Sequence, residues 1–219
     1  MMNGLIFDFD GTLAETFPVI FPAFRAALLH ETGKIYSDEE ISAQFGPSEE
    51  GIFQKLLADR WQEGLAIYHA EYRRLHPSLV KLYPGVPELL AWLQNQGLKL
   101  AIVTGKGAAS LAISVQELGL AGFFDHMESG SPIDGNKVPA ITRVVSAWGF
   151  DPGTVGYLGD APSDVRCARE AGVIPLGACW AEPGAVKRVT PADRVPCFGS
   201  VSEFQQWFRE NGTFESGPR

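Results

Sequence analysis

Four short, largely apolar runs, separated by stretches with helical periodicity, constrain the fold of this chain more than any other feature. The runs cover residues 5–9, 98–103, 155–158 and 173–178. Apolar runs of this length are typical of parallel strands that are buried on both faces of a sheet. Their alternation with helices predicts an α/β fold built on a doubly wound parallel sheet.

The stretches between the apolar runs have the features of helices. These predicted helices cover residues 84–96, 108–118, 138–148 and 162–171. Each ends close to a glycine, such as Gly97 or Gly149, which is a common way for a helix to stop. Towards the C-terminus we expect an edge strand at 193–197, a closing helix at 200–210 and a flexible tail at 213–219.

Residues 15–82 do not follow this alternation and are predicted to be helical throughout. The expected helices cover residues 18–30, 38–44, 49–57 and 60–75. Ser37 and Glu40 have the spacing of a capping box at the start of the second helix. We therefore predict an all-helical domain, the cap, inserted after the first strand of a Rossmann-like core that comprises residues 1–14 and 83–212.

Composition and charge exclude several classes of function. The chain has 18 Lys and Arg against 26 Asp and Glu, a net charge of −8 that disfavours a nucleic-acid partner. It has neither the pattern of a secretory signal nor the roughly 20 apolar residues that span a membrane. Cys167, Cys179 and Cys197 lack the spacing of a zinc site or a disulfide framework. We expect a cytoplasmic monomer or homodimer that does not bind membranes.

Polar residues follow several of the predicted strands at the point where each strand ends. In an open parallel sheet these ends lie at one edge, which is where ligands bind. The side chains brought together there are Asp8, Asp10, Thr12, Thr104, Lys106, Lys137, Asp160 and Asp164. Carboxylates so close together would be destabilising unless a cation joined them. The pattern therefore predicts a metal-assisted reaction at this edge.

In their order along the chain these residues resemble the motifs of the haloacid-dehalogenase-like hydrolase superfamily, and within it the phosphatases that have a helical cap. The motifs are Asp8-x-Asp10-Gly11-Thr12, Thr104, Lys137 and Gly159-Asp160-x-x-x-Asp164. Each is short, but their order and their position at strand ends make the set specific. The resemblance covers essentially the whole chain and implies a phosphoglycolate-phosphatase-like enzyme that acts on a small phosphorylated metabolite.

The chemistry of phosphate ester hydrolysis gives the acidic residues distinct roles. Asp8 is the expected nucleophile, which would attack phosphorus and form an aspartyl-phosphate. Asp10 is the expected general acid and base, protonating the leaving oxygen and then activating water. Mg²⁺ is the expected cofactor, because it reduces the repulsion between a carboxylate and a phosphate dianion. Its expected ligands are Asp8, Asp160 and, as the resemblance implies, the main-chain carbonyl of Asp10.

The remaining residues at the edge are expected to bind and position the phosphoryl group. Thr104, Gly105 and Lys106 would bind its non-bridging oxygens, while Lys137 would supply positive charge. Lys106 is the alternative to Lys137 for that last role. Asp164 would hold either a metal-bound water or Lys137. The supporting residues are Gly11, Thr12 and Asp164.

The cap is expected to select the substrate by closing over the site. Its candidate contact is the Gly-Pro break between two helices, with Gly46, Ser48 and Glu49 as candidate residues. An ordinary turn with Ser48 as helix N-cap explains this segment equally well. Four cap cations could contact a substrate carboxylate, although solvated helix faces explain them equally well: Lys55, Arg60, Arg73 and Arg74.

Other functions remain open within the same superfamily. Pyrophosphate and a nucleoside monophosphate are alternative substrates. A sugar-phosphate mutase would usually carry a histidine soon after the first motif, but the first histidine here is His30. A dehalogenase does not need the second carboxylate, Asp10. A catalytically idle relative with a binding or regulatory role would be expected to have lost Asp8, Asp10 or Asp160, and all three are present.

Overall fold

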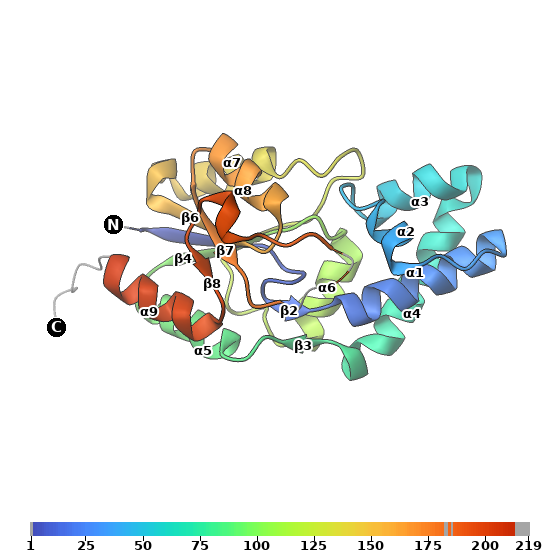
Figure 1. Cartoon of the computed structure of the whole chain (residues 1–219), viewed down its shortest axis with the longest axis horizontal. Coiled ribbons are helices and arrows are strands. Elements are labelled where there is room, and N and C mark those ends of the chain that lie inside the picture. The colour runs from blue at the N-terminus through green and yellow to red at the C-terminus, as the bar shows by residue number, and fades with distance from the viewer. Residues whose placement is uncertain (1, 182–183, 185, 213–219) are drawn as a thin grey trace.

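A six-stranded parallel sheet forms the centre of the larger lobe of the molecule (Figure 1). The computed structural model describes residues 2–181, 184 and 186–212. Along the sheet the order is β5-β4-β1-β6-β7-β8, and every neighbouring pair is parallel. The strands are β1 (Gly4–Phe7), β4 (Lys99–Val103), β5 (His126–Glu128), β6 (Val155–Gly159), β7 (Ile174–Ala178) and β8 (Cys197–Phe198). This topology confirms the predicted α/β fold.

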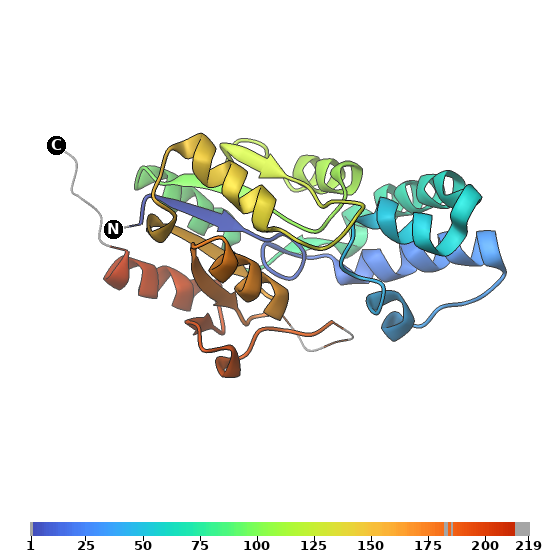
Figure 2. The same ribbon diagram turned by 90° about the horizontal axis from the view of Figure 1, so that it is seen from above.

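Helices cover both faces of the sheet because its central strands are apolar on both sides. In β1, Leu5 and Phe7 belong to the larger hydrophobic core, and Ile6 belongs to a second core on the opposite face. The helices on the first face are α5 (Val86–Asn95) and α9 (Val201–Asn211), and those on the second face are α7 (Val138–Trp148) and α8 (Pro162–Glu170). Seen from above, the two layers enclose the strands (Figure 2).

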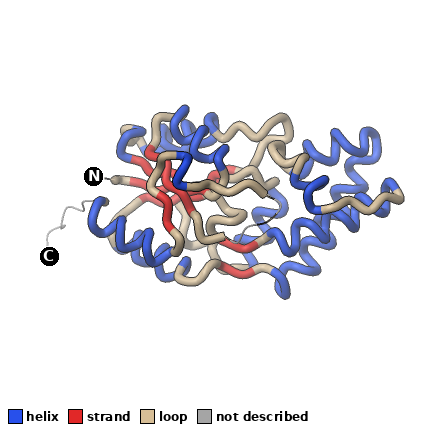
Figure 3. Tube along the Cα trace, viewed as in Figure 1, coloured by secondary structure: helices blue, strands red, loops and turns tan. Residues whose placement is uncertain are grey.

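The cap forms a second, helical lobe beside the carboxyl edge of the sheet (Figures 1 and 3). Its helices are α1 (Phe17–Thr32), α2 (Asp38–Ser42), α3 (Glu49–Leu57) and α4 (Trp61–Leu79), with a 3₁₀ turn at Ala58–Arg60. Its core is aromatic, and the ring of Phe24 lies 4.6 Å from that of Tyr68 and 5.1 Å from that of Phe53. The predicted helical insert is therefore confirmed. α6 (Ala108–Glu117) packs against α4 and so links the core to the cap.

The capping box predicted at the start of α2 is also confirmed. The Ser37 hydroxyl accepts a hydrogen bond from the Glu40 amide at 3.2 Å, and the Glu40 carboxylate accepts one from the Ser37 amide at 2.9 Å.

The two chain segments that join the lobes pair with each other. β2 (Ala14–Glu15) runs antiparallel to β3 (Lys81–Leu82), and the Tyr83 amide donates a hydrogen bond to the Leu13 carbonyl at 3.1 Å. Neither strand was predicted, because two residues are too few to show a periodic pattern.

The C-terminal part of the core differs from the expectation. The expected edge strand forms as β8, but only at Cys197–Phe198, so of the predicted range 193–197 only Cys197 belongs to it; before it the chain makes a 3₁₀ turn at Pro191–Asp193. Pro196 has no N–H to donate to a ladder, and only its carbonyl bonds β7, accepting from the Gly177 amide at 2.8 Å. The predicted flexible tail at 213–219 lies outside the described residues. In the part that is described, no helix combines the length and apolarity needed to cross a membrane.

Candidate active site

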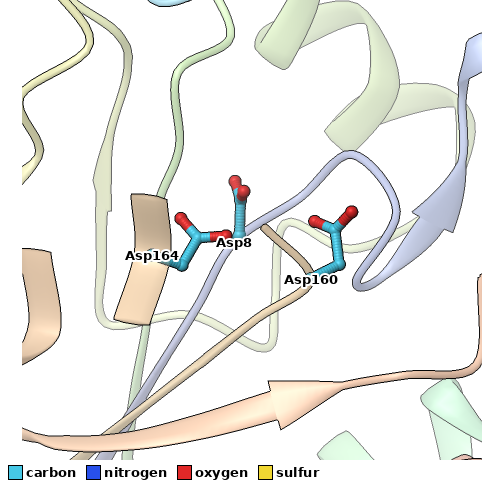
Figure 4. Close-up of side chains that lie close together, drawn as sticks. All are labelled: Asp8, Asp160 and Asp164. Atoms are coloured by element: carbon cyan, nitrogen blue, oxygen red, sulfur yellow. The ribbon is translucent and has the colours of Figure 1, made fainter. Parts of the chain in front are cut away.

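Three buried carboxylates meet at the carboxyl edge of the sheet. Asp8 follows β1, Asp160 follows β6, and Asp164 lies in the first turn of α8. An oxygen of each lies within 4.8 Å of the others, and Figure 4 shows Asp8 between the other two. Each strand ends in a polar residue just where its buried run stops, which explains why residues far apart in the chain gather here.

Lys137 joins two of these carboxylates. Its Nζ lies 2.7 Å from Asp8 Oδ2 and 2.7 Å from Asp164 Oδ1. Burial alone would lower the pKa of Lys137, but the carboxylates of Asp164 and Asp8 outweigh that effect and raise it. Asp164 also accepts a hydrogen bond from the Ala161 amide at 2.9 Å, at the start of α8. Of the roles considered for Asp164, contact with Lys137 is the one that the structure shows, and Lys137 rather than Lys106 contacts Asp8.

Asp10 has a different set of partners on the cap side of the site. Its Oδ1 accepts hydrogen bonds from Thr16 Oγ1 at 2.6 Å and from Lys106 Nζ at 3.0 Å. Burial raises the pKa of Asp10, although Lys106 and Thr16 oppose the change. A carboxyl that keeps its proton more readily than usual suits a general acid. The Lys106 ammonium is fully buried and lies 4.6 Å from the centre of the Tyr72 ring.

The environment of Asp160 fits a divalent cation. Burial, together with the charges of Asp8 and Asp164, raises the pKa of Asp160 to about 8. Arg188 pairs with Asp160 and Lys137 with the other two carboxylates, so three acidic groups face two cations. An excess of buried negative charge on hard oxygen atoms is what Mg²⁺ relieves.

The supporting residues Gly11 and Thr12 both lie against Asp160. Thr12 Oγ1 donates a hydrogen bond to Asp160 Oδ1 at 3.3 Å. Gly11 has a φ of +79°, and a Cβ at this position would collide with the Asp160 carboxylate. A glycine is therefore required here both by the backbone conformation and by the close approach of Asp160.

The predicted phosphate-binding residues fall in two adjoining cavities. Gly105 and Lys106 line the main cavity, of about 1010 Å³, together with the carboxylates of Asp8, Asp10 and Asp160. Thr104 is buried and instead lines a smaller cavity of about 320 Å³, which also includes Gly105 and Lys137. The Thr104 hydroxyl accepts a hydrogen bond from the Lys106 amide at 3.3 Å, so it helps to shape the loop that carries Lys106.

The three cap candidates also differ in whether they line the main cavity. Gly46 and Glu49 line the main cavity, whereas Ser48 is buried beside it and donates a hydrogen bond to Glu50 Oε2 at 2.6 Å. Ser48 occupies the N-cap position of α3, but its side chain makes no capping bond. The buried Glu49 carboxylate accepts hydrogen bonds from the Gly107 amide, from Ser110 and from Tyr68. The cap is therefore closed against the core in this structure.

The four cap cations considered as substrate contacts do not line either cavity. Three of them bond to polar residues within the cap, and Arg73 is exposed. The pairs are Lys55 with Gln44, Arg60 with Glu31, and Arg74 with Glu71. Of the two interpretations, solvated helix faces are the one that fits the structure.

Arg188 was not predicted as a site residue. It lies in the loop after β7, and its guanidinium pairs with Asp160 and stands 4.8 Å from the centre of the Phe17 ring. The rule that polar groups after parallel strands form the site also applies to β7 and would have drawn attention to this loop. The residue itself belongs to no motif in the sequence.

Comparison with known proteins agrees with this geometry. Residues 5–178 match the family model described as haloacid dehalogenase-like hydrolase. The fold and the acidic site thus define a class, the hydrolases of the haloacid dehalogenase type with a helical cap. The chain belongs to the haloacid dehalogenase-like hydrolase family, as the motifs had indicated.

Two relatives show what kinds of enzyme the chain is similar to. It is 32% identical to a phosphoglycolate phosphatase from Synechococcus elongatus over 182 residues, which cover 82% of this chain and 84% of the relative. It is 30% identical to the pyrophosphatase PpaX from Bacillus pumilus over 185 residues, which cover 84% and 86%. Both relatives are named as phosphatases, which supports assigning the chain to this group of hydrolases.

The fold has a similar counterpart among solved structures. A crystal structure of a "predicted phosphoglycolate phosphatase" from Haemophilus somnus 129pt superposes with a TM-score of 0.79. The match covers 94% of this chain and 97% of the other at 18% identity, so it shows that the fold is shared.

Proposed function

We propose that this protein is a Mg²⁺-dependent phosphatase that hydrolyses a small phosphate monoester through a phosphorylated Asp8. The observation that carries the proposal is the placement of Asp8. Its carboxylate lies between the two other carboxylates of a buried acidic cluster, is bonded to Lys137 and opens onto the main cavity. Mg²⁺ held by Asp8, Asp160 and the main-chain carbonyl of Asp10 would neutralise charge on the nucleophile and on the phosphoryl oxygens.

In the first step an oxygen of Asp8 attacks phosphorus, and the bond between phosphorus and the leaving oxygen breaks. Asp10 gives its proton to that oxygen, so the product leaves as a neutral alcohol. Lys137 keeps the nucleophile oriented through its 2.7 Å contact with Asp8 Oδ2, and its charge stabilises the anionic phosphoryl group.

In the second step Asp10, now ionised, takes a proton from water while the water oxygen attacks phosphorus. The bond between phosphorus and the Asp8 oxygen breaks, which releases inorganic phosphate and regenerates the Asp8 carboxylate. Asp10 ends the cycle protonated, as it began. The contacts of Asp10 with Lys106 and Thr16 support both roles, because they stabilise its ionised form against burial.

The relatives favour phosphoglycolate and pyrophosphate as the first substrates to assay. The carboxylates required for hydrolysis, Asp8, Asp10 and Asp160, all lie on the main cavity, which argues against a catalytically idle relative. A mutase remains less favoured, since the described part of the cap offers no histidine to the cavity.

The proposal is tested with 4-nitrophenyl phosphate, wild type and Asp8→Asn, each with and without Mg²⁺. We expect wild type to turn over only with Mg²⁺ and the variant to lose at least about a thousandfold in kcat, since Asn has no nucleophilic oxygen. Asp59→Asn, at an exposed position in the cap, is the matched control and should behave as wild type. If Asp8→Asn turned over at the wild-type rate, the proposed mechanism would be wrong.

A further inference from the structure

The cap side of the main cavity is an apolar wall. It is formed chiefly by Phe17, Ile20, Phe24, Phe45 and Ile52. Phe45 lies at its centre, with its ring 6.3 Å from the ring of Phe17 and 6.3 Å from that of Phe24. Phe45 and Phe17 are half-buried, so part of each ring stays exposed to the cavity, although Arg188 lies over one face of Phe17 and Phe21 stacks on Phe45. Packing apolar or aromatic ligand surface against such rings is favourable, because it removes that surface from water.

The cap brings no positive charge to this wall. Among the described residues of the cap, no Lys, Arg or His lines the cavity, and the ionisable cap residues that do line it are Glu39, Glu49 and Tyr68. Cap cations close by in sequence are occupied elsewhere, such as Arg25 with Asp38 and Lys34 with Glu40. The cations that reach the wall come from the core and are already paired, Arg188 over the Phe17 ring with Asp160 and Lys106 with Asp10. A carboxylate or phosphate on the leaving group would therefore lose its hydration against the wall without gaining a cation of the cap as partner.

The leaving group must face this wall rather than the core. Asp10, the proton donor to the leaving oxygen, bonds Thr16 immediately before the first cap helix. It also bonds Lys106, which lies over Tyr72 of α4 in the cap. The exposed cations Arg166, on α8, and Lys187, in the loop after β7, line the same cavity from the core rather than from the cap.

The size of the cavity agrees with a leaving group larger than two carbons. Its volume of about 1010 Å³ is at the upper end of the roughly 300–1,000 Å³ typical of sites for small molecules. A phosphorylated two-carbon acid would fill only a small part of this volume.

We infer that the leaving alcohol of the substrate is uncharged and has an apolar, ring-sized body that packs on Phe45 and its neighbours. The inference rests on the proposed function and specifies its substrate class. It separates this chain from enzymes whose leaving group is an acid or a second phosphate, whatever the names of its relatives.

The test compares kcat/KM for 2-phenylethyl phosphate, 2-phosphoglycolate and pyrophosphate. The first two share an unactivated primary alkyl leaving oxygen, so their difference reports recognition more than intrinsic reactivity. We expect 2-phenylethyl phosphate to be preferred at least tenfold over each of the others. Phe45→Arg places a cation in the wall. This change should reduce the preference for 2-phenylethyl phosphate over 2-phosphoglycolate at least tenfold. Leu29→Arg adds the same charge at an exposed position of α1 and should leave the ratio unchanged.

A second readout separates this inference from the proposed function. Mg²⁺-dependent exchange of ¹⁸O between inorganic phosphate and water needs Asp8 and Asp10 but no leaving alcohol. If exchange occurs but 2-phenylethyl phosphate is preferred less than tenfold, the inference is overturned and the proposed function stands. The same holds if exchange occurs and the ratio is unchanged in Phe45→Arg. Absence of exchange would overturn the proposed function, and the inference with it.

Discussion

Asp10 and Lys106 form the ion pair on which the proposed proton transfers depend. Lys106 Nζ lies 3.0 Å from Asp10 Oδ1, and its charge partly offsets the rise that burial causes in the pKa of Asp10. The pair thus sets the pH at which Asp10 can act as a general acid. Lys137, by contrast, is bonded to Asp8 and Asp164.

Replacing Lys106 by methionine tests whether Lys106 controls the protonation of Asp10. Without the ammonium group the pKa of Asp10 should rise further, so its acid form persists to higher pH. The alkaline limb of kcat/KM, measured as phosphate release, should therefore move to higher pH. Lys99→Met removes an exposed lysine of β4 that pairs with Asp125, and it should leave the profile in place. An alkaline limb that stays in place or moves to lower pH in Lys106→Met would contradict this role.

Single residues at the site were predictable where a strand end marked them. Asp8, Asp10 and Asp160 follow buried runs, and the rule for parallel sheets brings them to one edge. Whether Lys106 or Lys137 contacts Asp8 was open, because that depends on loop paths that no local pattern encodes. Arg188 was missed for the same reason, as its pairing with Asp160 is decided by the fold of the loop after β7.

At the scale of elements, Glu49 connects helix α3 of the cap with helix α6 of the core. Its carboxylate accepts a hydrogen bond from the Gly107 amide, at the N-terminus of α6, and another from Ser110. An anion at a helix N-terminus is favoured by the unpaired amides and the helix dipole. This contact therefore favours the closed position of the cap.

Glu49→Gln should weaken cap closure while keeping the shape of the side chain. A hydrogen bond to a charged group contributes about 1.5–3 kcal/mol, so we expect the Gly107 amide to exchange with solvent about ten- to a hundredfold faster. Hydrogen exchange with mass spectrometry measures this directly. Glu63→Gln, which removes an exposed carboxylate in the first turn of α4, is the matched control. Equal protection of Gly107 in both variants would show that Glu49 does not hold the cap closed.

Long elements were predicted more accurately than short ones. The helix expected at 138–148 has the same bounds in the structure, because its apolar face repeats over three turns and Gly149 ends it. The strands β2, β3 and β5 were missed, since two or three polar or mixed residues carry no period. They form only because the rest of the fold places a partner strand beside them.

At the scale of the whole molecule, the acidic site is expected to reduce the stability of the metal-free protein. Three buried carboxylates face two cations, so ion binding should stabilise the folded state. At Mg²⁺ concentrations about a hundredfold above Kd the gain is about 2.7 kcal/mol. For a chain of this size we expect Tm to rise by about 5–10 °C. Asp160→Asn should abolish most of the rise.

The stabilisation of the folded protein by Mg²⁺ should also depend on pH. In the metal-free folded protein the pKa of Asp160 is raised to about 8, well above its usual value. Its burial therefore costs stability progressively as pH rises from about 4 to 8, because the unfolded chain loses that proton first. Since Mg²⁺ competes with the proton, the rise in Tm should be larger at pH 8.5 than at pH 6. A rise independent of pH would contradict the role given to Asp160.

Phosphorylation of Asp8 is tested most directly by trapping the phosphorylated enzyme. Wild type turning over 4-nitrophenyl phosphate with Mg²⁺ is quenched in acid, reduced with borohydride and digested for mass spectrometry. Reduction converts an aspartyl-phosphate to homoserine, and we expect homoserine at position 8 and at no other aspartate. Rapid turnover that leaves Asp8 unmodified, or that labels another residue, would contradict it.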